Sequence, residues 1–287
     1  MIYASSATDG SAMRCEARIN GPSIYLDHWA IVRLAEKEPG LRQRFLNLIR
    51  LGMELLFSVA NAAELAGSQG KSADDVRSFL AEIGPRWFPV ELDTVTVLKR
   101  ENQGIDIAQL AASGAFVESF VKFRMRSIPP DKLVSFDDDF FSLAGALDWV
   151  VSQRESIKEG CAKFDQVLRE KCLKAFARGK QEGKAWVDQR FPQVPFDENR
   201  RVNFVWRNLM RILIKEPQSI KKGDGLDFSH AVIGSTFASF ATMDTQWKKR
   251  IEKLPKPNRI ARVYAPSELE QMIADMESYM RPLKAPL

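Results

Sequence analysis

Several residue types are scarce in this chain, and each scarcity excludes a class of protein. Among 287 residues there are three cysteines, an odd number without a CxxC pair. A disulfide framework and a cysteine zinc site are therefore excluded, and a reducing compartment, the cytoplasm, is expected. The two histidines, His28 and His230, lack the spacing of a histidine metal motif.

Long apolar runs are also missing. No segment reaches the roughly 18 apolar residues of a membrane-spanning helix, so no membrane partner is expected. Residues 1–21 lack a basic stretch followed by an apolar one, which argues against a secretory signal. We expect them to form a flexible N-terminal lead-in. No internal repeat of fixed period is present.

What remains is the composition of an ordinary globular protein, with 45% apolar and 28% charged residues. The net charge of +5 is unevenly distributed. Residues 151–222 contain 17 Lys or Arg and 9 Asp or Glu, a net charge of +8, which leaves −3 for the rest of the chain. Such a basic segment is suited to binding phosphate groups next to a metal site. A solvated helical surface is the alternative, and the sequence leaves both open.

Short apolar runs alternate with helical patterns at both ends of the chain. Strands are predicted at residues 24–27, 53–59, 238–244 and 261–266, and residues 86–93 fit either a short strand or an exit loop. Helices are predicted between and after them, at residues 28–37, 39–50, 61–67, 72–83, 245–254 and 267–283. This alternation is typical of βαβ units. We therefore predict an α/β fold, a three-layer α/β/α sandwich with a central parallel sheet.

The middle of the chain has a different character. Apolar residues such as Ile157, Cys161 and Phe164 recur at spacings of three and four, which predicts a helix over residues 137–178. The sequence thus divides into an α/β domain of residues 22–95 and 221–287 and a large helical insertion of residues 96–220.

Four acidic residues occupy comparable places in the predicted α/β domain. Asp27 and Asp244 each end a predicted strand, and Glu64 and Asp227 lie near the start of a helix. The carboxyl ends of parallel strands meet at one edge of a sheet, where ligands bind. Carboxylates brought together there repel one another unless a cation joins them, and hard divalent ions prefer oxygen ligands. Two such ions can flank a phosphodiester and activate water.

Each acid also has a simpler explanation. Asp27 and Asp244 precede helices and fit N-caps, and Glu64 fits a solvated helix surface. Asp224 lies three residues before Asp227, which suits either a cap or an auxiliary metal ligand. The four acids in matching places favour the metal site over four independent caps.

Four segments that carry these acids resemble the PIN-domain nucleases: YLD (25–27), SVANAAEL (58–65), DFSHAVIGS (227–235) and ATMDTQW (241–247). The resemblance covers roughly residues 22–95 and 221–270. It implies a PIN-like fold in which the four acids are catalytic and bind one or two Mg²⁺ or Mn²⁺ ions. The chain departs from the family pattern in the 163 positions that separate Glu64 from Asp227, in His230 and in Trp247.

Further residues are expected to assist these acids. His28 and His230 are close enough in sequence to hydrogen-bond Asp27 and Asp227, although isolated histidines are also frequently structural. Thr242 matches the Thr or Ser beside the last acid of the family. Seven cations near the acids are expected to bind nucleic acid, with solvated surfaces as the alternative: Lys221, Lys222, Arg207, Arg211, Lys248, Lys249 and Arg250.

The predicted function is metal-dependent endonucleolytic hydrolysis of RNA. The resemblance implies roles in RNA processing, in toxin–antitoxin pairs or in phage defence, with an inhibitory protein partner or a homodimer. Two rivals stay open: a structure-specific DNA nuclease that uses the same acids, and a non-catalytic PIN-like scaffold that binds nucleic acid. A phosphatase-like hydrolase of small molecules is a third, which the basic insertion disfavours.

Overall fold

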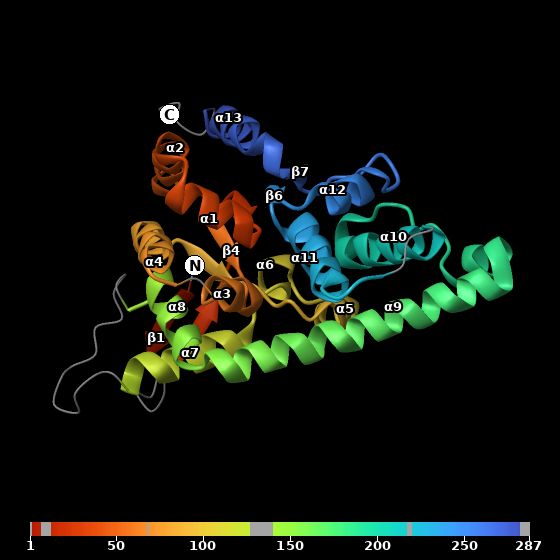
Figure 1. Ribbon diagram of the computed structural model, residues 1–287, viewed down its shortest axis with the longest axis horizontal. Coiled ribbons are helices and arrows are strands. Elements are labelled where there is room, and N and C mark those ends of the chain that lie inside the picture. Colours follow the sequence, from red (N-terminus) through yellow and green to blue (C-terminus); the bar gives the residue numbers. More distant parts are fainter. Residues whose placement is uncertain (1, 7–12, 68, 127–139, 217–219, 282–287) are drawn as a thin grey trace.

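The computed structural model describes residues 2–6, 13–67, 69–126, 140–216 and 220–281 (Figure 1). Its centre is one sheet of five parallel strands. In chain order these are β3 (Ser23–Tyr25), β4 (Glu54–Phe57), β5 (Trp87–Pro89), β6 (Phe240–Thr242) and β7 (Arg262–Tyr264). The predicted α/β fold with a central parallel sheet is confirmed. The four predicted strands are present, and a strand, β5, also forms within residues 86–93, whose sequence fits either a strand or a loop.

Burial of the strands shows that both faces of the sheet are covered. Every residue of β3, β4, β5 and β6 is buried. Successive side chains of a strand point to opposite faces, so continuous burial requires a layer on each side. This arrangement is that of a three-layer sandwich.

Thirteen α-helices are present in the described part of the chain. They are α1 (His28–Glu36), α2 (Pro39–Arg50), α3 (Val59–Leu65), α4 (Lys71–Ile83), α5 (Thr94–Asn102), α6 (Ile107–Leu110), α7 (Gly114–Arg126), α8 (Leu143–Ser152), α9 (Arg154–Arg190), α10 (Arg201–Lys215), α11 (Asp224–Phe237), α12 (Thr245–Glu252) and α13 (Leu269–Met280), with 3-10 helices η1 (Glu198–Arg200) and η2 (Pro266–Glu268). Five of the α-helices start at a residue whose side chain accepts a hydrogen bond from the first turn: Asp27, Ser58, Asp93, Ser142 and Asp244. None of the described helices is both long and apolar enough to cross a membrane.

The N-terminal residues differ from the expected flexible lead-in. β1 (Ile2–Ser6) and β2 (Met13–Ala17) pair as antiparallel strands, in register from Ile2 opposite Ala17 to Ser6 opposite Met13. Ile2 and Ala17 are buried, and β2 packs against α7. Burial of these short strands against the helices explains why a stretch with weak local signals has regular structure.

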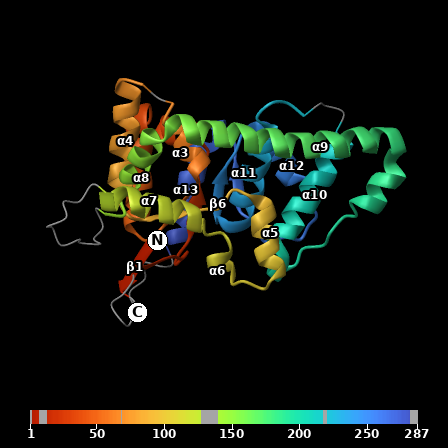
Figure 2. The same ribbon diagram turned by 90° about the horizontal axis from the view of Figure 1, so that it is seen from below.

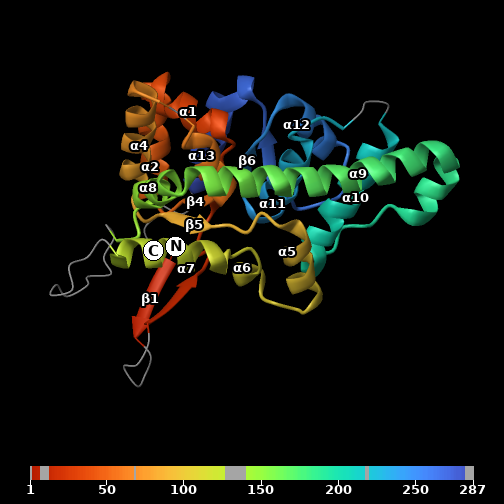
Figure 3. The same ribbon diagram turned by 60° about the horizontal axis from the view of Figure 1, so that its bottom comes forward.

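The insertion is predominantly helical in its described residues, and it is packed into the α/β unit. The helix expected over residues 137–178 is divided into α8 and α9, and residues 137–139 lie outside the described part. α9 spans 37 residues, with a kink at Gly183, and crosses α3, α11 and α10 (Figures 2 and 3). α8 packs against α3 and α4. The insertion therefore lies beside the helices that carry the predicted acids.

Candidate metal centre

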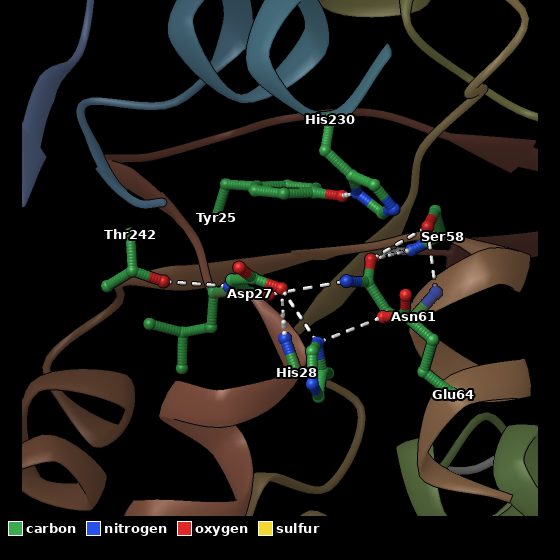
Figure 4. A network of polar contacts seen from close by, with 9 residues as sticks. Tyr25, Asp27, His28, Ser58, Asn61, Glu64, His230 and Thr242 are labelled. Carbon is green, nitrogen blue, oxygen red and sulfur yellow. Dashed lines mark hydrogen bonds and ion pairs between the residues drawn. The ribbon is translucent and has the colours of Figure 1, made fainter. Parts of the chain in front are cut away.

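The order of the strands places two of the acids together. The sheet runs β5-β4-β3-β6-β7, so the chain proceeds from β3 in one direction and returns to β6 on the other side. The reversal between β3 and β6 is the topological switch point, outside which α/β proteins bind ligands. Asp27 follows β3 by two residues and Asp244 follows β6 by two residues. The backbone N–H of Asp27 donates to Oγ1 of Thr242 at 2.7 Å, which ties the two strand ends together (Figure 4).

Three of the four predicted acids share one small pocket. Asp27, Asp227 and Asp244 line it together with His230 and Thr242. Its open space of about 20 Å³ is roughly what one water molecule occupies, which also suits one ion. These three acids line one pocket, whereas the group of three in the described residues whose ligand atoms lie within 4.8 Å of one another is Asp27, His28 and Glu64.

The electrostatics of Asp227 reflect this convergence. Burial, together with the charges of Asp27, Asp244 and Asp224, raises the pKa of its carboxyl to about 7. A carboxyl with this pKa is about half protonated at neutral pH. A cation in the pocket would remove the repulsion and compete with that proton.

Capping and metal binding are compatible at this edge. Oδ1 of Asp27 accepts from the backbone N–H of His28 at 2.7 Å, and Oδ1 of Asp244 accepts from the N–H of Trp247 at 2.7 Å. In each carboxylate Oδ2 has no hydrogen bond among the described residues. One oxygen of each acid thus fixes the helix start while the other remains for a ligand.

Glu64 lies close to Asp27, and His28 contacts both carboxylates. Nδ1 of His28 lies 3.0 Å from Oδ1 of Asp27 and 3.3 Å from Oε2 of Glu64 (Figure 4). These three residues can bring one ligand atom each to within 4.8 Å of one another. Hydrogen bonds to the two carboxylates raise the pKa of His28 to about 10. At neutral pH the imidazolium therefore neutralises part of the negative charge.

A buried polar cluster lies behind the acids. Tyr25 hydrogen-bonds Nδ1 of His230, and Nε2 of His230 has no partner in the described structure. Burial lowers the pKa of His230, so its ring is neutral. Ser58 and Asn61 form a reciprocal capping box at the start of α3, and Nδ2 of Asn61 donates to the Leu26 carbonyl at 3.4 Å. Tyr25 and Asn61 were not predicted; the Ser-x-x-Asn spacing is the signal that could have identified Asn61.

Asp224 is not part of the pocket. Its carboxylate accepts from the backbone N–H of Lys221, which is a local turn contact. The acid that caps α11 is Asp165, from α9 in the insertion. Its Oδ1 accepts from Gly225 and Leu226 at 3.0 and 3.1 Å, and its Oδ2 accepts from Gly223 at 3.1 Å. Sequence reasoning missed Asp165, which lies about 60 positions away and has no local motif.

The approach of α9 to α11 depends on Gly225. A Cβ at this position would lie 2.5 Å from the Asp165 carbonyl oxygen, closer than any carbon tolerates. Glycine therefore allows the insertion to dock onto the helix that carries Asp227.

Of the seven predicted nucleic-acid-binding cations, three are buried or paired with an acid and four are exposed. The assignment of Arg250 is corrected: the side chain is 4% exposed, and its Nη2 lies 2.9 Å from Glu216. Lys248 is held by Glu268 at 2.5 Å, and Arg211 is held by Asp188. The remaining four cations are exposed: Lys221, Lys222, Lys249 and Arg207. The partners Glu216, Glu268 and Asp188 are distant in the chain, so local patterns do not identify these ion pairs, whereas the contact of Lys248 with Glu252, four residues later, is local.

Comparison with protein-family models, curated proteins and solved structures finds no match to this chain.

Proposed function

We propose that this protein is a metal-dependent phosphodiesterase that cleaves RNA. The observation that carries the proposal is the shared pocket of Asp27, Asp227 and Asp244 at the switch point, in which burial and the charges of Asp27 and Asp244 raise the pKa of Asp227. Three carboxylates around a space the size of one ion repel one another, and folding alone does not require them there. A cation-binding role explains this otherwise unfavourable arrangement.

The residues present fit a hard divalent ion. Oxygen atoms of Asp27 and Glu64, which lie within 4.8 Å of each other, and of Asp227 and Asp244, which line the pocket with Asp27, would hold Mg²⁺ or Mn²⁺. Bound there, the ion supplies Lewis-acid chemistry: it polarises a phosphoryl oxygen and lowers the pKa of a water. Thr242 fixes the position of Asp27 through its hydroxyl, and Asp165 fixes the start of the helix that carries Asp227.

The choice of RNA as substrate rests on the resemblance of the four acid-bearing segments to PIN-domain nucleases. The strand order and the large share of helix are compatible with that resemblance. The rival functions, cleavage of DNA and binding without catalysis, use the same residues. They differ in the products that a cleavage assay detects.

The test is cleavage of a mixed pool of single-stranded and structured RNA, with Mn²⁺ and with EDTA. Wild type is compared with Asp27→Asn and with the matched control Asp224→Asn. The control removes an acid that lies three positions before Asp227 in the sequence but does not line the pocket. Cleavage that needs Mn²⁺, that Asp27→Asn abolishes and that Asp224→Asn retains supports the proposal. Cleavage of a parallel DNA pool alone transfers the function to DNA. Mn²⁺ binding without cleavage of either pool leaves a binding protein.

A further inference from the structure

A groove leads away from Glu64 between α3 and the insertion helix α9. Its first part has about 280 Å³ of space, and its lining includes Glu64, Ala60 and Leu226 with Arg154 and Lys158 from α9. Leu226 directly precedes Asp227, so the groove begins beside the candidate metal centre. Figure 2 shows α9 passing across α3 and α11 at this point.

The first part of the groove has two cations, Arg154 and Lys158, against one carboxylate, that of Glu64, so it favours an anion. Arg154 and Lys158 are one helical turn apart, and neither has a hydrogen bond or ion pair among the described residues. Arg154 is the first residue of α9, where the helix dipole disfavours a cation, and Lys158 lies one turn later on the same side. An unpaired cation at the unfavourable end of a helix breaks a local rule, and such departures are expected where a ligand compensates for them.

The second part of the groove has the opposite character. It shares Ala60, Cys161 and Leu226 with the first part and continues for another 280 Å³ or so. Its walls are mainly apolar and include Ile157 and Phe164. Glu91 and Asp93 stand at this part, where they repel a phosphate. A flat uncharged group, such as one nucleobase, fits this environment.

We propose that this groove binds a single-stranded segment of the substrate RNA, with backbone phosphates on Arg154 and Lys158 and a base against Phe164. The inference rests on the proposed function for the position of the cleaved bond. Bases of a duplex are stacked and paired, so they cannot enter an apolar pocket while their phosphates contact α9. A single strand can place a base in the apolar part of the groove and its phosphates on α9. The following phosphates of the strand then lie next to the carboxylates of the candidate metal centre.

The test measures binding of a fluorescent 12-nucleotide RNA by anisotropy in EDTA, which prevents metal-dependent hydrolysis. The variant Arg154→Ala/Lys158→Ala removes the groove cations. Its matched control is Lys163→Ala/Lys171→Ala, which removes two exposed cations of the same helix that do not line the groove. Phe164→Leu removes the aromatic face, and Phe164→Tyr retains it. Thermal unfolding checks that each variant is folded.

We expect the groove variant to bind at least about tenfold more weakly. The slope of log affinity against log salt concentration should also become shallower by about 1.4, for two lost phosphate contacts. The control pair should change affinity by less than about twofold, since its lysines lie outside the groove. Phe164→Leu should weaken binding by about tenfold and Phe164→Tyr far less. A blunt duplex should bind more weakly than the single strand.

Two results would overturn the inference: equal binding by the groove variant and wild type, or a duplex bound as tightly as the single strand. Failure of the proposed function looks different. If the groove variants behave as expected but wild type cleaves no RNA with Mn²⁺, the groove stands and the nuclease proposal fails. If Arg154→Ala/Lys158→Ala cleaves RNA at the wild-type rate, the nuclease proposal stands and the groove fails.

Discussion

The backbone N–H of Asp27 and the side-chain hydroxyl of Thr242 are joined by a hydrogen bond of 2.7 Å. Thr242 is fully buried at the end of β6, so this bond fixes the separation of the two strands at the switch point. The orientation of the Asp27 carboxylate then depends on a residue more than two hundred positions away.

Thr242→Val keeps the shape of the side chain but removes the oxygen that accepts this bond. The N–H of Asp27 would lose its partner, so we expect the free energy of unfolding to fall by about 1–3 kcal/mol. Thr242→Ser, which retains the hydroxyl, should lose less. Urea denaturation measures both variants, and equal losses would show that the methyl group matters rather than the hydrogen bond.

Asp227→Asn should have opposite effects on the metal-free and metal-bound protein. The folded-state pKa of Asp227, about 7, lies above its ordinary value of 3.8. This raised pKa favours folding below pH 4, and the contribution is lost as the pH rises to 7. At pH 8 the metal-free variant should therefore melt at a higher temperature than wild type. Saturating Mn²⁺ should reverse that order; a variant that Mn²⁺ stabilises as much as wild type would contradict the prediction.

His28→Gln tests the cation between Asp27 and Glu64. The folded-state pKa of His28, about 10, lies above its ordinary value of 6.5. Its contribution to stability is complete below pH 6.5 and is lost as the pH rises to 10. Thermal scans should show a lower melting temperature for the variant at pH 7 and a smaller difference at pH 10. In the proposed site Mn²⁺ takes over the neutralising role of this cation, so the variant should bind Mn²⁺ at least as tightly; weaker binding would identify His28 as a ligand.

Asp165→Ala tests how the insertion supports the site. Three backbone N–H groups at the start of α11 would lose a charged acceptor, so we expect a loss of at least about 2 kcal/mol in stability. Mn²⁺ affinity should also fall because Asp227 lies in the first turn of α11. Glu159→Ala, on the exposed surface of the same helix, is the control. Unchanged Mn²⁺ affinity in a folded Asp165→Ala protein would show that the cap does not position Asp227.

The sheet and the convergence of three acids could be predicted because their signals are local. Asp27 and Asp244 each end a short buried apolar run and begin a helix, and the chain direction of parallel strands then brings them to one edge. The common edge follows from chain direction alone. That Asp27 and Asp244 are also neighbours depends on the strand order, which places β3 and β6 side by side and which the sequence alone does not state.

Other features depend on contacts between distant segments. Nothing near Asp165 indicates that it caps a helix 60 residues later, and nothing near Arg250 indicates a buried ion pair with Glu216. Glu64 was expected to join the acids directly, and it lies close to Asp27, with His28 in contact with both carboxylates. Each of these outcomes is decided by tertiary packing, which local patterns do not encode.

The most direct test of the metal centre is calorimetric titration of metal-free protein with Mn²⁺ at pH 8, where Asp227 is ionised. We expect wild type to bind Mn²⁺, and Asp27→Asn, Asp227→Asn and Asp244→Asn each to bind at least about tenfold more weakly. Asp224→Asn should bind within about twofold of wild type, since its carboxylate lies outside the pocket. No binding by wild type, or an equal loss in Asp224→Asn, would show that these carboxylates do not form a specific metal site.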